Sequence, residues 1–292
     1  MAKTGKSKKK VSAYAEAWRR LRKNKVAMAA MVAVILLILM AALADVIVPY
    51  DKAITQSGAL QLAKPSAEHW FGCDQMGRDL FARVVHGSRI SLLLGFGTTL
   101  VTTIVAVALG TSAAYFGGKF DNILMRCFDI LIAIPSVLLA LAISAGFGNG
   151  IVQLMCAIAI GQLASFTRVI RSAVLNLVDQ EYIEAERAMG LNNARIIMTH
   201  IIPNAMGTIL VQATMQVSRN ILMGALLSFL GLGAPIPTPE WGQIASDGIS
   251  YLRYTSHIVL FPTIFITLTA LAINLFGDGL RDALDPRLKG KA

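Results

Sequence analysis

Charged side chains are scarce in this sequence of 292 residues. Asp, Glu, Lys and Arg together make up only 15% of it, whereas 55% of the residues are hydrophobic. This balance excludes an ordinary soluble domain and indicates a membrane protein. The three cysteines, Cys73, Cys127 and Cys156, are too few and too widely spaced for a disulfide framework or a zinc site. We expect them to be packing residues, and we expect no metal site.

Groups that carry out catalysis or bind nucleotides are also missing. No nucleophile, base or metal ligands form a recognisable constellation, so the pattern argues against a membrane enzyme. Gly5-Lys6-Ser7 resembles the end of a phosphate-binding loop, but the glycine required five positions earlier does not exist. Nearly all the net charge lies in one amino-terminal tail rather than over a folded face, so we expect no nucleic acid partner. We also expect no cofactor in this chain.

Apolar runs long enough to cross a bilayer dominate the rest of the sequence. The first covers residues 26–44, and others lie at 90–118, 130–167, 205–233 and 258–277. At ~1.5 Å per residue, the run at 130–167 is roughly twice the length that one span needs. The glycines at 146, 148 and 150 predict a turn in its middle. We therefore predict an all-α, polytopic membrane protein with six transmembrane helices.

The distribution of positive charge predicts the orientation of these helices. The formal net charge is +10, and residues 1–25 alone contain ten basic residues and one acid, Glu16. An even number of spans puts both termini on one side, and the positive-inside rule predicts that this side is the cytoplasm. Against this orientation, Arg78, Arg83 and Arg89 cluster on the predicted outer side.

The predicted organisation has five parts. They are a basic cytoplasmic tail with a short amphipathic helix at 1–25, a first transmembrane helix at 26–48, an extracytoplasmic segment at 49–89, a five-helix core at 90–280 with a cytoplasmic loop at 168–203, and a cytoplasmic tail at 281–292. Residues 231–255 form a second extracytoplasmic segment, in which alternate prolines preclude a regular helix. Trp241 is expected at the membrane interface there.

The cytoplasmic loop at 168–203 has the composition of two short helices. Asp179 is placed to cap the first helix, and Gly190 is placed to end it. A second helix is predicted from Asn192 or Asn193 to Pro203. The loop either forms a knob that a cytosolic partner grips, or it lies on the lipid surface or covers its own bundle. The pattern favours neither.

The residues of this loop carry a resemblance to a known family. Glu184-Ala185-Glu186, then Gly190, then His200-Ile201-Ile202-Pro203 resemble the EAA motif of ATP-binding-cassette (ABC) importer permeases. Glu184, Ala185, Gly190 and Pro203 match by identity, whereas Glu186 replaces an alanine and His200 an isoleucine. Further stretches are similar to the C-type subunit of dipeptide, oligopeptide and nickel permeases: residues 71–79, 87–92, 133–135, 228–233, 237–242 and 277–286.

This resemblance implies the type I ABC importer permease fold in a bacterial plasma (inner) membrane. It also implies four kinds of partner: a second homologous permease subunit, two cytosolic ABC ATPase subunits that bind ATP and Mg, an extracytoplasmic substrate-binding protein, and membrane lipid. The six motif residues would couple this chain to the ATPases: Glu184, Ala185, Glu186, Gly190, His200 and Pro203. A loop of about 35 residues cannot house a nucleotide-binding domain. We therefore expect a transport subunit rather than an enzyme.

Dipeptides or oligopeptides are the substrates that the resemblance favours. Import of nickel or another small solute by an ABC system is the alternative. A secondary transporter is a weaker one, because the sequence shows no pair of related halves with matching ionisable residues.

Arg219 is the only strong base well inside a predicted span, where a charge costs ~3 kcal/mol on insertion scales. It either contacts a substrate carboxylate, or it pairs with an acid of a partner subunit or with the backbone. Members of the family often have an acid where this chain has Gly224. We therefore assign Arg219 and Gly224 to the translocation pathway. Asp129 and Asp278 are expected to cap helices or to form interface ion pairs.

Overall fold

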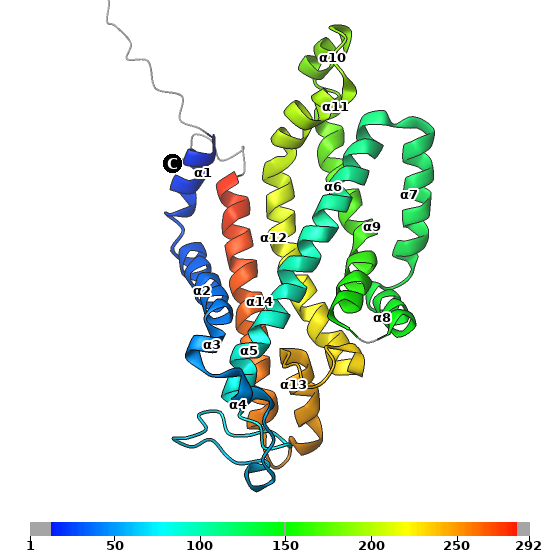
Figure 1. Ribbon diagram of the computed structural model, residues 1–292. Coiled ribbons are helices and arrows are strands. Elements are labelled where there is room, and N and C mark those ends of the chain that lie inside the picture. Colours follow the sequence, from blue (N-terminus) through cyan, green and yellow to red (C-terminus); the bar gives the residue numbers. More distant parts are fainter. Residues whose placement is uncertain (1–12, 149, 285–292) are drawn as a thin grey trace, which may run out of the picture.

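The computed structural model describes residues 13–148 and 150–284, and these residues form helices joined by short connections. Long helices lie side by side in one bundle, and short helices cover both of its ends (Figure 1). No β-strand occurs in these two ranges, in agreement with the predicted all-α class. The stretch Gly5-Lys6-Ser7 and the carboxyl-terminal tail from position 285 lie outside the described residues.

The amino-terminal part places the first span against the last one. Asn24 caps α2, and its side chain accepts a hydrogen bond of 3.1 Å from the backbone N–H of Ala27. Ala17 and Leu21 are buried in one apolar cluster with Ala283, so the short first helix lies on the end of the last helix. The elements of this part are α1 (Ala13–Leu21), α2 (Lys25–Ala42), α3 (Ala44–Ile47), α4 (Tyr50–Ile54) and η1 (Gly58–Leu60).

The second span begins earlier than the predicted residue 90. It consists of α5 (Leu80–Leu92), a π-helical turn η2 (Leu93–Gly97) and α6 (Thr98–Phe116). Asp79 caps α5, since its side chain accepts a 2.8 Å hydrogen bond from the backbone N–H of Ala82. The arginines at positions 83 and 89 interrupt the apolar run in the sequence. Both have partners in the fold, so they do not end the helix.

The third span is a bent pair of helices, which corrects the prediction of a straight span from residue 130. Helices α7 (Gly118–Ala133) and α8 (Ser136–Phe147) meet at an angle of 90° beside Pro135. The charged residues of α7 lower its hydropathy, so the sequence analysis did not assign it to a span. One of them, Asp129, forms an ion pair of 2.6 Å with Arg168 of α9. Within residues 13–148 and 150–284, five continuous helical stretches are long and apolar enough to cross a membrane, and counting the bent pair gives the six predicted spans.

The second half of the chain completes the bundle. The turn predicted around residues 146–150 is confirmed, because α9 (Ile151–Val178) starts directly after it. The predicted end of a helix at Pro203 is wrong. The chain stays helical through that proline, which sits in the first turn of α12, where a missing N–H costs least. The remaining elements are α10 (Glu181–Ala188), α11 (Asn193–Ile196), π-helical η3 (Ile197–Ile201), α12 (Ile202–Leu227), π-helical η4 (Ser228–Leu232), α13 (Trp241–Gly248), η5 (Ile249–Tyr251) and α14 (His257–Leu284).

Helices α6 and α9 approach each other closely at Gly110. A Cβ atom on Gly110 would lie 2.8 Å from the carbonyl oxygen of Thr167, which is closer than such atoms pack. We predict that Gly110→Ala lowers the melting temperature of the purified protein, because forcing packed helices apart costs about 1–3 kcal/mol. Gly207→Ala is the matched control, since a Cβ there meets nothing within 4 Å. Equal melting temperatures for Gly110→Ala and the wild type would contradict this packing.

Candidate coupling loop and transport pathway

The loop between α9 and α12 contains the two predicted short helices. Gly190 ends the first of them with φ = +78°, a left-handed conformation that glycine adopts without strain. Asn192 caps α11, because its side chain accepts a 2.9 Å hydrogen bond from the backbone N–H of Ala194. The predicted role of Asp179 is wrong. Asp179 is the C-cap residue of α9, and Gln180 stands at the N-cap of α10 without a side-chain hydrogen bond.

The inner face of this loop is anchored to the bundle. Ile183, Ile196 and Ile201 are completely buried. They share one apolar cluster with side chains of α6 and α9, among them Tyr115 and Ile170. The loop therefore covers its own bundle with one face, which was part of the second alternative drawn from the sequence.

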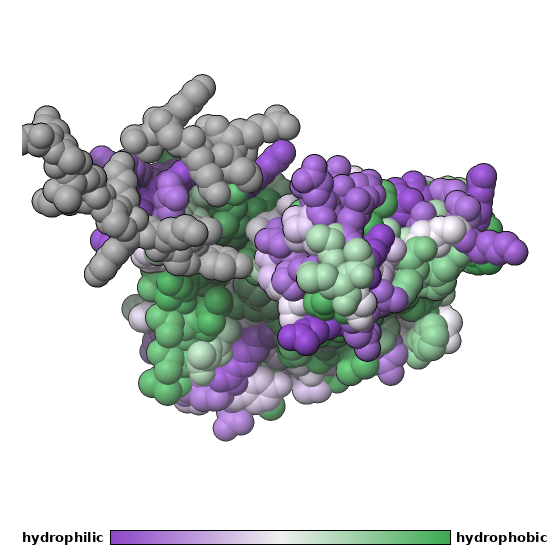
Figure 2. All heavy atoms as spheres, turned by 90° about the horizontal axis from the view of Figure 1, so that it is seen from above, coloured by the Kyte–Doolittle hydropathy of each residue, from purple (hydrophilic) through white to green (hydrophobic). Residues whose placement is uncertain are grey.

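The outer face of the loop remains uncovered. Glu184 and Ala185 are exposed, and so is Gly190. Met189 is 70% exposed, although it is apolar. Figure 2 looks onto this end of the molecule, where hydrophilic residues surround a small apolar patch over the loop. Exposed methionines beside charged residues are typical of a surface that binds another protein.

Side-chain contacts tie the loop to the helices beneath it. The Tyr115 hydroxyl of α6 donates a 2.8 Å hydrogen bond to the side-chain oxygen of Asn193. The Arg187 guanidinium lies 4.4 Å from the centre of the Tyr115 ring, within the range of a cation–π contact. Glu186 Oε1 lies 3.1 Å from His200 Nε2, which links α10 to η3 and is an ion pair only when the histidine is protonated.

The structure brings together only some of the predicted coupling residues. Glu186 and His200 touch, and both depart from the family motif. Glu184, Ala185 and Gly190 lie together on the outer side of α10 and its terminal turn, whereas Pro203 is exposed at the start of α12. No signal in the sequence indicated Tyr115, whose role depends on a contact between residues far apart in the chain.

The two predicted pathway residues lie in different surroundings. Arg219 is exposed on α12 and has no hydrogen-bond or ion-pair partner within residues 13–148 and 150–284. Gly224 is buried, and a Cβ atom there would lie 3.1 Å from Leu94 and 3.7 Å from Ile158. Gly224 therefore allows close packing of α12, while Arg219 faces away from the packed interior.

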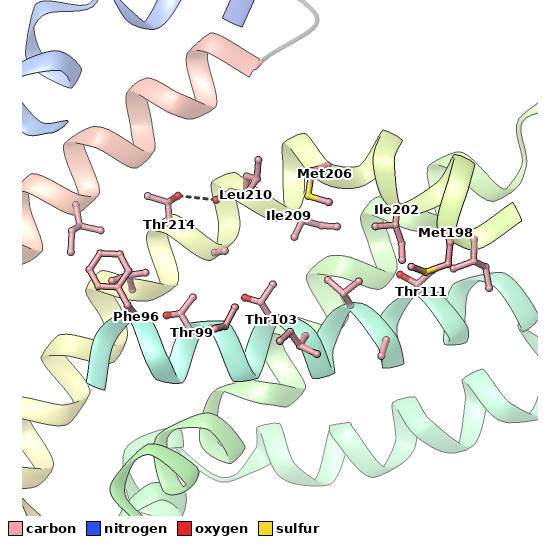
Figure 3. A pocket seen from close by; sticks show the side chains of 18 of the residues that line it. Phe96, Thr99, Thr103, Thr111, Met198, Ile202, Met206, Ile209, Leu210 and Thr214 are labelled. Atoms are coloured by element: carbon pink, nitrogen blue, oxygen red, sulfur yellow. Dashed lines mark hydrogen bonds between the residues drawn. The ribbon is translucent and has the colours of Figure 1, made fainter. Parts of the chain in front are cut away.

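A large hollow of about 960 Å³ borders the other side of α12. Figure 3 shows side chains of the α6 and α12 segments pointing toward each other across it. Its lining is almost wholly apolar, and its few polar groups are hydroxyls such as those of Thr103 and Thr111. Such a surface fits hydrocarbon, from lipid tails or from an apolar helix, better than a polar solute.

A buried ionic cluster at the opposite end of the bundle was missed by the sequence analysis. Asp74 is completely buried and accepts hydrogen bonds from the side chains of Arg78 and Arg83. Asp247 of α13 lies 3.7 Å and 3.5 Å from the same two guanidinium groups. Burial alone would raise the pKa of Asp74, but Arg83 and the hydrogen bonds from Arg78 outweigh it and hold that pKa below its ordinary value.

Buried hydrogen bonds at the start of α13 also fix this helix against α5. Glu240 is 1% exposed and accepts hydrogen bonds of 2.9 Å from the backbone N–H groups of Gly242 and Gln243. Burial raises the pKa of Glu240 in spite of these hydrogen bonds. Trp241 is completely buried and donates a 2.8 Å hydrogen bond to the carbonyl of Val84, so its predicted place at the membrane interface is wrong. Of the arginines that counted against the predicted orientation, Arg78 and Arg83 are therefore internal ion partners, whereas Arg89 pairs with the exposed Asp45.

Comparison with protein families identifies what the chain resembles. Residues 106–290 match the family described as binding-protein-dependent transport system inner membrane component. Residues 12–65 match the N-terminal transmembrane domain of oligopeptide transport permease C. The resemblance drawn from the EAA residues is thereby confirmed.

Three curated relatives match nearly the whole chain. The dipeptide transport system permease protein DppC of Alkalihalophilus pseudofirmus is 44% identical and covers 96% of this chain and 91% of its own length. The glutathione transport system permease protein GsiD of Pectobacterium atrosepticum is 42% identical, with coverages of 94% and 91%. The oligopeptide transport system permease protein OppC of Bacillus subtilis is 40% identical, with coverages of 97% and 92%.

Among solved structures, the fold is similar to that of a chain in the inward-facing MetNI methionine ABC transporter. The TM-score is 0.58 at 20% sequence identity, and the match covers 70% of this chain and 98% of that one. The match confirms the predicted fold.

Asp74 allows a test of the buried ionic cluster. We predict that Asp74→Asn destabilises the segment around Arg78 and Arg83 by about 3 kcal/mol, because two buried guanidinium groups lose their closest carboxylate. The measurement is the rate of proteolysis of this segment in purified protein, with Asp51→Asn as an exposed control. The ionised Asp74 stabilises the fold fully above its unfolded pKa of about 4, so the difference should shrink only below that pH. Equal proteolysis of wild type and Asp74→Asn at neutral pH would contradict the prediction.

Proposed function

Since the chain belongs to the family of inner-membrane components of binding-protein-dependent transport systems, and is thus a multi-pass permease of a bacterial inner membrane, we propose that it imports peptides with energy from ATP hydrolysed on partner chains. The proposed partners are a second homologous permease, two cytosolic ABC ATPases that bind ATP and Mg, and an extracytoplasmic substrate-binding protein. Membrane lipid covers the apolar helix faces that remain exposed.

The coupling loop is the observation that carries this proposal. Its outer face displays Glu184, Ala185 and Gly190, and its inner face is fixed to α6 and α9 by three buried isoleucines. A protein that grips the outer face can therefore move the spans directly, because the loop cannot yield independently of them. This arrangement supports docking of an ATPase there, and it supports a cytoplasmic location for the loop and for both termini.

The proposed transport cycle follows from these contacts. When the two ATPases close on nucleotide, they pull the loop, and the attached spans tilt to open the path toward the outside. Hydrolysis and reopening reverse the tilt. The binding protein docks on the two extracytoplasmic segments, residues 49–89 and 231–255, which the ionic cluster of Asp74, Arg78, Arg83 and Asp247 holds together.

Peptides are the proposed substrates because the curated relatives are named for transport of dipeptides, oligopeptides and glutathione, which is itself a peptide. Import of nickel or another small solute is the alternative within the same mechanism. Uptake of labelled dipeptides, oligopeptides and nickel complexes by cells that lack this gene distinguishes these substrates. Loss of nickel uptake with normal peptide uptake would overturn the peptide assignment.

Glu184 and Gly190 test the coupling role. We predict that Glu184→Ala and Gly190→Ala reduce peptide uptake per ATP hydrolysed by about tenfold, a usual size for coupling between sites. The first removes an exposed contact for the ATPase, and the second strains the left-handed turn. The measurement compares uptake and ATP hydrolysis by the complete importer in proteoliposomes.

Glu181→Ala is the matched control for this test, since Glu181 is an exposed acid on the same helix outside the motif. It should leave the ratio of uptake to hydrolysis unchanged. Normal uptake in both Glu184→Ala and Gly190→Ala would show that the loop does not couple transport to the ATPases.

A further inference from the structure

One face of α12 is polar along most of its length. Asn204, Thr208, Gln212 and Arg219 are spaced by four, four and seven residues, which places them on one side of a helix. Asn204, Thr208 and Arg219 are exposed, and Gln212 is half-buried. This side lies opposite the apolar hollow, whose α12 lining comes from other positions such as Met206 and Leu210. Helix α12 therefore presents two unlike faces.

Helix α9 carries a matching polar face. Gln162, Ser165, Ser172 and Asn176 are spaced by three, seven and four residues, again on one side of a helix. Ser165, Ser172 and Asn176 are exposed, and Gln162 is half-buried. An apolar residue, Val169, lies between them on the same side. Ala173 and Leu177 also border this side, and amide and hydroxyl groups recur between these apolar residues along the face.

The two polar faces border one groove. A hollow of about 470 Å³ near the coupling loop is lined by Ser172 and Asn176 of α9 and by Asn204 and Thr208 of α12. The two helices run in opposite directions, because α9 leads into the loop and α12 leads out of it (Figure 1). From Thr208 to Arg219 is ~16 Å along α12, and from Ser172 to Gln162 is ~15 Å along α9. Arg219 therefore lies at the level of Gln162.

Polar groups exposed at membrane depth require a polar environment. An uncompensated charge inside a bilayer costs ~3 kcal/mol or more. The amides of Asn176 and Asn204 donate to backbone carbonyls of their own helices, so the charge of Arg219 carries this argument. Arg219 finds no partner within the described part of the chain. The faces of α9 and α12 thus border water or a polar solute rather than lipid tails. The polar faces of α9 and α12 carry one cation, Arg219, and no acid among the residues named above, so a negative charge is their complement.

We propose that the polar faces of α9 and α12 form a wall of the substrate path, and that Arg219 binds the carboxylate of the solute as it passes. This inference rests on the proposed import function and names the group that the path recognises. Amides and hydroxyls along the wall offer hydrogen bonds to peptide groups of any sequence, because they donate and accept without regard to side chains. Arg219 selects for a free carboxylate by a charge-assisted hydrogen bond.

The test compares two forms of one peptide in the complete importer, reconstituted with its binding protein in proteoliposomes. The initial rate of ATP-driven uptake is measured for a dipeptide with a free carboxylate and for its carboxamide, each at a concentration that saturates the binding protein. We expect Arg219→Gln to lower uptake of the free acid by about tenfold relative to the carboxamide. Arg219→Lys should retain most of the selectivity, and Arg126→Gln, which alters an exposed base on α7, should have no effect.

Each other result has a definite meaning. An equal loss of uptake for both peptides in Arg219→Gln would overturn the proposal and indicate that Arg219 pairs with an acid of a partner subunit. Unchanged uptake of both peptides would overturn it as well. If the wild-type complex does not transport either peptide with ATP, the proposed function fails before any variant is compared.

Discussion

The contact of three buried isoleucines with α6 and α9 determines what the loop between α9 and α12 can do. Ile183, Ile196 and Ile201 have no exposed surface, and burial of each contributes about 1.5–3 kcal/mol. They join the coupling loop to the spans as one body. The exposed motif residues then form a surface whose displacement must be passed on to the bundle. The contacts around Tyr115 extend this attachment to the end of α6.

The opposite end of the bundle is held by charge rather than by apolar contact. Asp74 and Asp247 bind the same two arginines, and Glu240 fixes the start of α13 beside α5. Buried ion pairs add little net stability, but loss of one partner is costly, so such a cluster enforces one arrangement of the segments. Because both ends of the bundle are held in this way, the long helices between them are the parts that can change their tilt.

Hydropathy and the EAA residues predicted most of the architecture, because both depend on neighbours in the sequence. The apolar run at 26–44, the glycine turn near 148 and the caps at Asn192 and Gly190 are of this kind. The early start of α5 and the bent third span were not predictable. Arg89 and Asp129 look like ends of spans in the sequence, and only their distant partners Asp45 and Arg168 show otherwise. Of the site, the exposed motif and Arg219 could be named in advance. The isoleucine anchor, Tyr115 and the ionic cluster depend on contacts across the fold.

The π-helical turn at residues 228–232 ends α12, where Gly231 has φ = +85°. Two others interrupt spans within the described part of the chain, at residues 93–97 and 197–201. Each accommodates one more residue than an α-helical turn, so the side chains beyond it are rotated by about 100° from where an unbroken helix would place them. One continuous helix can in this way present one chemistry on the near side of the turn and another on the far side. If such a turn returned to α-helical geometry, the part of the helix beyond it would rotate about the helix axis, without any change in the tilt of the helix.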